Sequence, residues 1–106
     1  MLLEGSCHCG ATGFSVESPH PYPFNRCYCS ICRKLAGGGG YAIKLGARYE
    51  TLKVTGRNHI RVYQVDVGGG QKSPLERHFC GTCGTMLFVW DSRWPDLLHP
   101  HAGAID

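Results

Sequence analysis

The sequence has no long hydrophobic run and little excess charge. No stretch approaches the roughly 18 apolar residues of a membrane-spanning helix, so no membrane association is expected. The first six residues, MLLEGS, have neither the basic start nor the apolar segment of a secretory leader, which predicts a cytoplasmic location. The formal charge of +3 comes from 11 Lys and Arg scattered among 8 Asp and Glu. Without a basic stripe, no nucleic-acid partner is expected.

The chain is short, and no linker or internal repeat divides it. A length of 106 residues predicts one domain, residues 1–106. A core of this size is marginal by burial alone, so cross-links are expected. The chain has seven cysteines. Thiols stay reduced in the cytoplasm, which favours metal ligation over disulfides.

Alternation of apolar and polar residues is the main periodic signal, and it has the period of β-strands. It occurs over residues 13–17, 41–45, 51–55 and 63–67. Residues 86–90, in contrast, form one continuous apolar run, MLFVW, as expected for a strand covered on both faces. The 15 glycines and 6 prolines fall largely between such runs. The layout predicts a mainly β fold, a small antiparallel sandwich or barrel.

One short helix is expected, from about Ser30 to Ala36. Ser30 would be its N-cap, and the run of glycines that begins at Gly37 would end it. The proline-rich residues 19–23 are interpreted as a connection between a hairpin and the second of the three cysteine clusters.

Two of the three cysteine clusters each supply a pair of sulfurs. The segment CGTC at residues 80–83 is a turn that can direct two sulfurs at one zinc ion, and its glycine frees the backbone. The segment CHC at residues 7–9 supplies two more. Together they would close a four-thiolate structural zinc site that ties the start of the chain to its last third. The predicted ligands are Cys7, Cys9, Cys80 and Cys83.

The middle cluster, Cys27, Cys29 and Cys32, places three thiolates within six residues. One zinc ion could be held on three ligands with its fourth position open, which is the arrangement of catalytic zinc. The site could instead be structural if His78 or His101 supplied the fourth ligand.

Other roles for the cysteines have less support. Disulfides would leave one of seven cysteines over, and neighbours in Cys-x-Cys are poorly placed to bridge each other. A thioredoxin-like pair needs a βαβ context that the pattern lacks. An iron–sulfur cluster also accepts thiolates and stays open as an alternative.

Three motifs carry a family resemblance. They are GSCHCG at residues 5–10, CYCSICRK at residues 27–34 and RHFCGTCGT at residues 77–85, followed by GAID at residues 103–106. In this order they resemble the glutathione-dependent formaldehyde-activating enzyme family, which also includes the centromere protein V group. The likeness spans nearly the whole chain.

The resemblance implies a fold, two metal sites and an activity. The fold is mostly β and shared with Rab-accessory exchange proteins. The outer two motifs would bind a structural zinc ion and the middle motif a labile, catalytic one, giving two Zn²⁺ per chain. The implied reaction joins formaldehyde to glutathione to give S-hydroxymethylglutathione, a carbon–sulfur lyase activity, so the expected partner is a small thiol such as glutathione.

Family members usually run on past the segment that resembles residues 103–106, so a shortened form is expected. The resemblance transfers no glutathione-binding residue, and the sequence predicts no oligomeric state. A non-catalytic zinc module that binds a protein partner remains the alternative function. Its motivation is the short chain and the lack of a recognisable base or nucleophile other than the cysteines.

Overall fold

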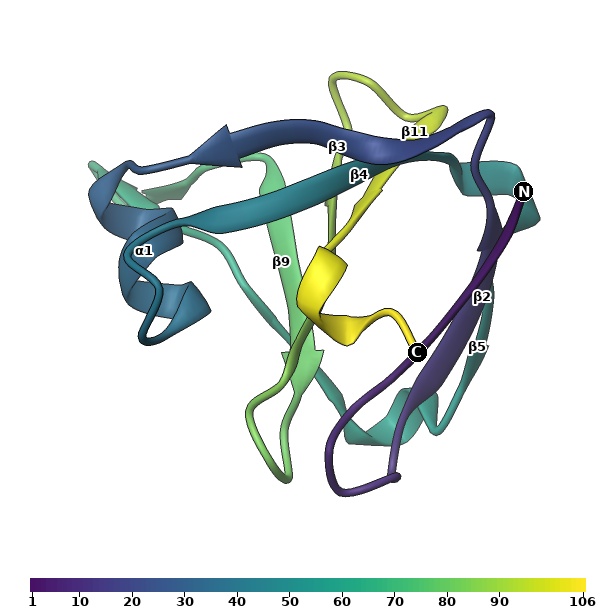
Figure 1. The fold of residues 1–106 in the computed structure, drawn as a ribbon. Helices are drawn as coiled ribbons and strands as arrows, with labels where there is room; N and C mark the ends of the chain where they lie inside the picture. The colour runs from purple at the N-terminus through teal and green to yellow at the C-terminus, as the bar shows by residue number, and fades with distance from the viewer.

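The structure is a computed structural model that describes residues 1–106 except for the side chains of Pro21 and Pro23. Its elements form two antiparallel sheets, a small ribbon and one helix (Figure 1). The smaller sheet has the strand order β1-β2-β5. Its strands are β1 (Leu2–Ser6), β2 (Gly13–Glu17) and β5 (Lys53–Thr55).

The larger sheet has six strands in the order β3-β4-β11-β10-β9-β6, each antiparallel to its neighbours. The strands are β3 (His20–Cys27), β4 (Ala42–Arg48), β6 (Ile60–Tyr63), β9 (Leu75–Cys80), β10 (Met86–Asp91) and β11 (Leu97–Pro100). β7 (Asp66–Gly68) and β8 (Gln71–Lys72) form the separate ribbon. Short 3-10 turns are η1 (Tyr49–Thr51), η2 (Arg57–His59) and η3 (Ala102–Ala104).

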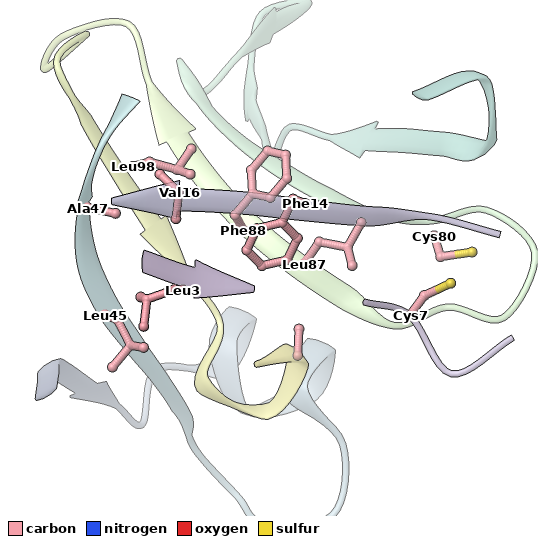
Figure 2. Close-up of a cluster of buried hydrophobic side chains, with 11 residues drawn as sticks. Leu3, Cys7, Phe14, Val16, Leu45, Ala47, Cys80, Leu87, Phe88 and Leu98 are labelled. Atoms are coloured by element: carbon pink, nitrogen blue, oxygen red, sulfur yellow. The ribbon is translucent and has the colours of Figure 1, made fainter. Parts of the chain in front are cut away.

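The main core lies between β2 and the inner face of the larger sheet (Figure 2). Phe14 and Val16 point inward from β2 at alternate positions, and the ring of Phe14 meets Phe88 edge-on with centroids 5.4 Å apart. Leu87, Phe88 and Val89 are all buried, because β10 is covered on both faces. A buried side chain of this size stabilises the fold by about 1.5–3 kcal/mol. The mainly β prediction is confirmed, and residues 86–90 form the expected core strand.

The helix α1 (Ser30–Ala36) has the predicted bounds, but its N-cap is Cys29 rather than Ser30. Cys29 has extended backbone angles, and its sulfur accepts a hydrogen bond from the backbone N–H of Cys32. In Figure 1, α1 lies at the end of the β3–β4 pair that is far from β2 and β5. Within the part of the chain that the structure describes, no helix is long and apolar enough to cross a bilayer.

Two sequence predictions about strands were wrong. Residues 19–23 are not only a connection, since β3 already begins at His20. β3 is an edge strand with register shifts against β4, and an edge can accept proline because half of its N–H groups need no partner strand. Residues 63–67 do not form one strand: β6 leaves β9 after Tyr63, and β7 begins at Asp66.

Candidate metal centre

The outer cysteines meet where two loops come together, one between β1 and β2 and one between β9 and β10. The sulfurs of Cys7 and Cys9 are 3.6 Å apart and those of Cys9 and Cys80 are 3.8 Å apart. A disulfide would need about 2.05 Å. A tetrahedral zinc ion with Zn–S bonds of about 2.3 Å would separate its sulfurs by about 3.8 Å. Together with Cys83, all four sulfurs lie within 4.8 Å of one another, so this group could hold a metal ion.

Both loops close in the same way, with a glycine in the left-handed region after the second cysteine. The N–H of Gly10 donates to the carbonyl of Cys7 at 3.2 Å, and the N–H of Gly84 donates to the carbonyl of Cys80 at 2.8 Å. Their φ angles are 82° and 84°, which residues with a Cβ rarely adopt. The glycines therefore turn the chain sharply enough for both sulfurs of each loop to point to one place.

The outer group is half buried. Cys7 and Cys80 belong to the core, with 5% and 0% of their surface exposed, whereas Cys9 and Cys83 are exposed. Figure 2 shows the side chains of Cys7 and Cys80 next to each other at the margin of the core, with both sulfurs on the side away from it. The two buried cysteines anchor the group in the core, and the two exposed cysteines form its solvent-facing side.

Thr85 links the two loops of the outer group. Its hydroxyl oxygen accepts a hydrogen bond from the backbone N–H of His8 at 3.1 Å and lies 3.2 Å from the sulfur of Cys83. The hydroxyl of Thr85, together with backbone N–H groups of Thr85 and Cys9, stabilises the thiolate and lowers the pKa of Cys83 to about 5. A thiolate is the form that binds metal.

The middle cysteines sit at the junction of β3 and α1. Cys27 is the last residue of β3, Cys29 caps α1 and Cys32 lies in its first turn. Their sulfurs all lie within 4.8 Å of one another, and Cys32 is buried while Cys29 is exposed. The backbone N–H of Cys32 and then the thiol of Cys27 lower the pKa of Cys29 to about 7. This group could also hold a metal ion, and one side of it faces solvent.

The two histidines considered as a fourth ligand lie outside both groups. The Nε2 atom of His78 is 3.0 Å from a carboxylate oxygen of Glu76, and the His78 ring stacks on Phe88. His101 is buried, and burial together with the charges of Lys44 and Arg77 lowers its pKa to about 4. Among the side chains that the structure describes, the middle group has three ligand atoms and no fourth.

Arg77 was not assigned a role from the sequence. Its Nη1 atom donates to the sulfur of Cys32 at 3.5 Å, across 45 residues of chain, and only 5% of the residue is exposed. The sole sequence signal was its place at the start of the motif RHFCGTCGT. Charged side chains are rarely buried without a partner, so the sequence alone gave no reason to place it inside.

A cavity of about 560 Å³ adjoins α1 and the loop that carries Cys83. This volume is within the range of small-molecule sites. Ser30 and Ile31, between Cys29 and Cys32, form part of its wall, and Lys34 is its only ionisable amine. The complete lining is Ser30, Ile31, Lys34, Leu35, Tyr63, Phe79, Gly84 and Met86.

Known proteins resemble this chain over nearly its whole length. The family model described as glutathione-dependent formaldehyde-activating enzyme matches residues 2–106. The chain belongs to this family. A relative from Halomonas elongata, provisionally named a glutathione-dependent formaldehyde-activating enzyme, is 64% identical over 106 residues, which are all of this chain and 67% of the relative.

The fold is shared with a solved structure as well. A crystal structure of a Rhodobacter sphaeroides protein has a TM-score of 0.69 and 25% identity, and the match covers 97% of this chain and 87% of that one. The family resemblance drawn from the three motifs is confirmed. The chain is thus a mainly β member of the formaldehyde-activating family with two cysteine groups that could hold metal ions.

Proposed function

We propose that residues 1–106 act as one zinc-dependent domain that joins formaldehyde to glutathione, or a related aldehyde to a small thiol, at the middle cysteine group. The observation that carries the proposal is the contrast between the two groups. The outer group brings four sulfurs together, whereas the middle group has three sulfurs and one side exposed to solvent. Four ligands are typical of structural zinc, and three with an open position are typical of catalytic zinc.

The donor chemistry favours zinc at both groups. All seven donors are thiols, which zinc accepts and which magnesium or calcium do not. The proposed structural ligands are Cys7, Cys9, Cys80 and Cys83, and the proposed catalytic ligands are Cys27, Cys29 and Cys32. Thiolate ligands also suit the reducing cytoplasm, where we place the protein.

A zinc ion at the middle group supplies Lewis-acid chemistry, which favours the thiolate form of a thiol or polarises a carbonyl group. The protein's own residues prepare this place. Cys29 and Cys32 are held one helical turn apart by the N-cap hydrogen bond, and Arg77 fixes the sulfur of Cys32 from the buried side. The exposed side at Cys29 is left for the substrate.

The reaction has a simple balance of atoms. The sulfur of the thiol forms a bond to the carbonyl carbon, and the proton of the thiol ends on the former carbonyl oxygen. With formaldehyde, the product is the S-hydroxymethyl adduct of the thiol, a hemithioacetal. The reverse step breaks the same carbon–sulfur bond and returns the proton to sulfur. No oxidant or reductant is needed.

The cavity beside α1 is our candidate for the glutathione site. It is mainly apolar, and the ammonium group of Lys34 is placed to attract a carboxylate of the tripeptide. Ser30 and Ile31 join this wall directly to the middle cysteines, so a thiol bound in the cavity would be close to them.

The experiment compares the exchange of [13C]formaldehyde with its glutathione adduct, measured by NMR, with and without the protein. The wild-type protein loaded with zinc should raise the exchange rate well above the spontaneous rate, and Cys29→Ser should not. Equal rates with and without the wild-type protein would contradict the enzyme assignment. That outcome would favour the alternative, a zinc module that binds a protein partner.

A further inference from the structure

Arg77 is a buried charge without a carboxylate partner. Only 5% of the residue is exposed, and a guanidinium group stays protonated in proteins. Among the side chains that the structure describes, no acidic group pairs with it, and its Nε atom has no hydrogen-bond partner. Its one side-chain contact with an anion-forming group is the sulfur of Cys32.

The surroundings of Arg77 add positive charge rather than remove it. Lys44, which is 7% exposed, lies beside His101 in the sheet, and the charges of Lys44 and Arg77 both act on the buried ring of His101. An uncompensated charge in such a place destabilises the fold. A negative charge next to Arg77 would offset that cost.

The middle cysteine group is the place where that negative charge would arise. Three thiolates exceed the charge of one divalent ion by one negative charge, and a substrate thiolate would add a second. Both charges would lie within reach of a guanidinium that already donates to one of the three sulfurs. The buried arginine and the anionic metal site would thus stabilise each other.

We infer that Arg77 is a positioning residue whose guanidinium balances the charge of the metal site formed by Cys27, Cys29 and Cys32. This inference rests on the proposed function, because it needs a metal ion at the middle group. Through its N–H donor to Cys32, Arg77 strengthens metal binding there and leaves the outer group unaffected. If Arg77 only filled space in the core, it would be equally buried, but its substitution would not weaken metal binding at one site more than at the other.

The test measures zinc affinity of each site by competition with a chelator at constant pH. Arg77→Met keeps an unbranched apolar stem but removes the guanidinium and its charge, and it should weaken the middle site at least about tenfold, the effect usual for groups that support metal ligands. Arg77→Lys keeps the charge and N–H donors, so its loss of affinity should stay below about tenfold. If Arg77→Met does not fold, Arg77→Gln replaces it, since glutamine keeps N–H donors but has no charge. Its zinc affinity at the middle site should fall as much as that expected for Arg77→Met.

Lys44→Met is the matched control, since it removes a buried positive charge that has no hydrogen bond to a cysteine sulfur. It should leave the affinity ratio of the two sites nearly unchanged. Cobalt-loaded protein gives a second readout: the thiolate-to-metal charge-transfer band of the middle site should move in Arg77→Met but not in Lys44→Met.

The possible results separate the inference from the proposed function. A loss of zinc affinity at the middle site alone in Arg77→Met, with affinity largely retained in Arg77→Lys, supports the role of Arg77. Unchanged affinity in the variants without charge, equal loss at both sites, or failure of lysine to rescue would overturn it while the metal site stands. A wild-type protein that binds only one metal ion, at the outer group, would overturn the inference and the proposed catalytic site together.

Discussion

The sulfur of Cys9 lies 3.8 Å from the sulfur of Cys80, although 71 residues separate them in the chain. The contact joins the loop after β1 to the last residue of β9, and these two strands belong to different sheets. A metal ion at this place would cross-link the sandwich at one end. Such a closure stabilises a small domain mainly by removing freedom from the unfolded chain.

Cys83→Ser is expected to unfold the domain, whereas Cys29→Ser is expected to leave it folded but inactive. Both side chains are exposed, so neither change creates a cavity in the core. A domain of this size has about 5–15 kcal/mol of stability in total, and loss of a structural zinc site can remove all of it. Circular dichroism and metal content would be measured together. Equal loss of structure in the two variants would mean that the middle site is structural too.

Thr85→Val tests the support of the outer group by its hydroxyl. The change keeps the shape of the side chain but leaves the N–H of His8 without its acceptor and Cys83 without its donor. We expect a loss of about 1–2 kcal/mol in unfolding free energy and weaker metal binding at the outer group only. Thr85→Ser should behave as wild type in the same denaturant titration. A fully stable Thr85→Val protein would show that the hydroxyl is not needed.

A pair of glycines tests the close contact between the turn after β5 and the loop that joins β1 to β2. Gly56 and Gly69 both have positive φ angles, 66° and 62°. A Cβ on Gly56 would clash with the carbonyl oxygen of Ala11, while a Cβ on Gly69 would meet open space. Gly69→Ala should therefore cost only the backbone strain, about 1–2 kcal/mol. Gly56→Ala should cost clearly more, or prevent folding. The loss of stability of each variant is measured by thermal unfolding. Equal losses in the two variants would contradict the close contact between Gly56 and Ala11.

Acid should destabilise the domain through one buried and two half-buried histidines. Burial lowers the pKa of His101 to about 4, and those of His78 and His99 are lowered as well. The unfolded chain then binds protons first, so the contribution of these histidines to the free energy of unfolding is constant above about pH 6.5 and falls as the pH drops toward 4. For His101 the loss would reach about 3 kcal/mol.

His101→Phe is the variant that isolates this effect, since the Nε2 atom of His101 has no hydrogen-bond partner among the described groups. Its unfolding free energy, measured by urea titration at several pH values with metal content monitored, should fall less steeply below pH 6.5 than that of wild type. Parallel pH curves for the two proteins would assign the acid sensitivity to other groups.

Lys34→Met tests the proposed glutathione site. Loss of the ammonium group from the cavity wall should raise the KM for glutathione about two- to fivefold, because exposed charge pairs contribute at most about 1 kcal/mol. Arg33→Met is a matched control: it removes a neighbouring exposed charge from the same helix but does not line the cavity. If both variants, or neither, change KM, the cavity beside α1 is not the glutathione site.

The spacing of cysteines within each cluster is local, so backbone geometry alone sets the separation of the sulfurs in Cys-x-Cys and Cys-x-x-Cys. Which clusters share one site was predicted from the ligand count, two plus two in one group and three in the other, and the structure brings together those sets. The core strand at residues 86–90 was predictable for a similar reason, since an unbroken apolar run needs cover on both faces.

Other parts depend on contacts that sequence spacing does not encode. β9 reads LERHFC, with polar residues through its centre, and it is a strand because it pairs with β10 and β6 on its two sides. Arg77 within it is buried only because the sheet brings it to Cys32. The N-cap of α1 was missed because the sulfur of Cys29 takes the role that a serine usually fills.

Stepwise reconstitution of metal-free protein with zinc, followed by the formaldehyde–glutathione exchange rate at each step, tests the central claim most directly. The outer four-thiolate group should fill first and restore the fold, and exchange activity should appear only as the second equivalent enters the group of Cys27, Cys29 and Cys32. Full activity after one equivalent, with the middle group still empty, would contradict the account.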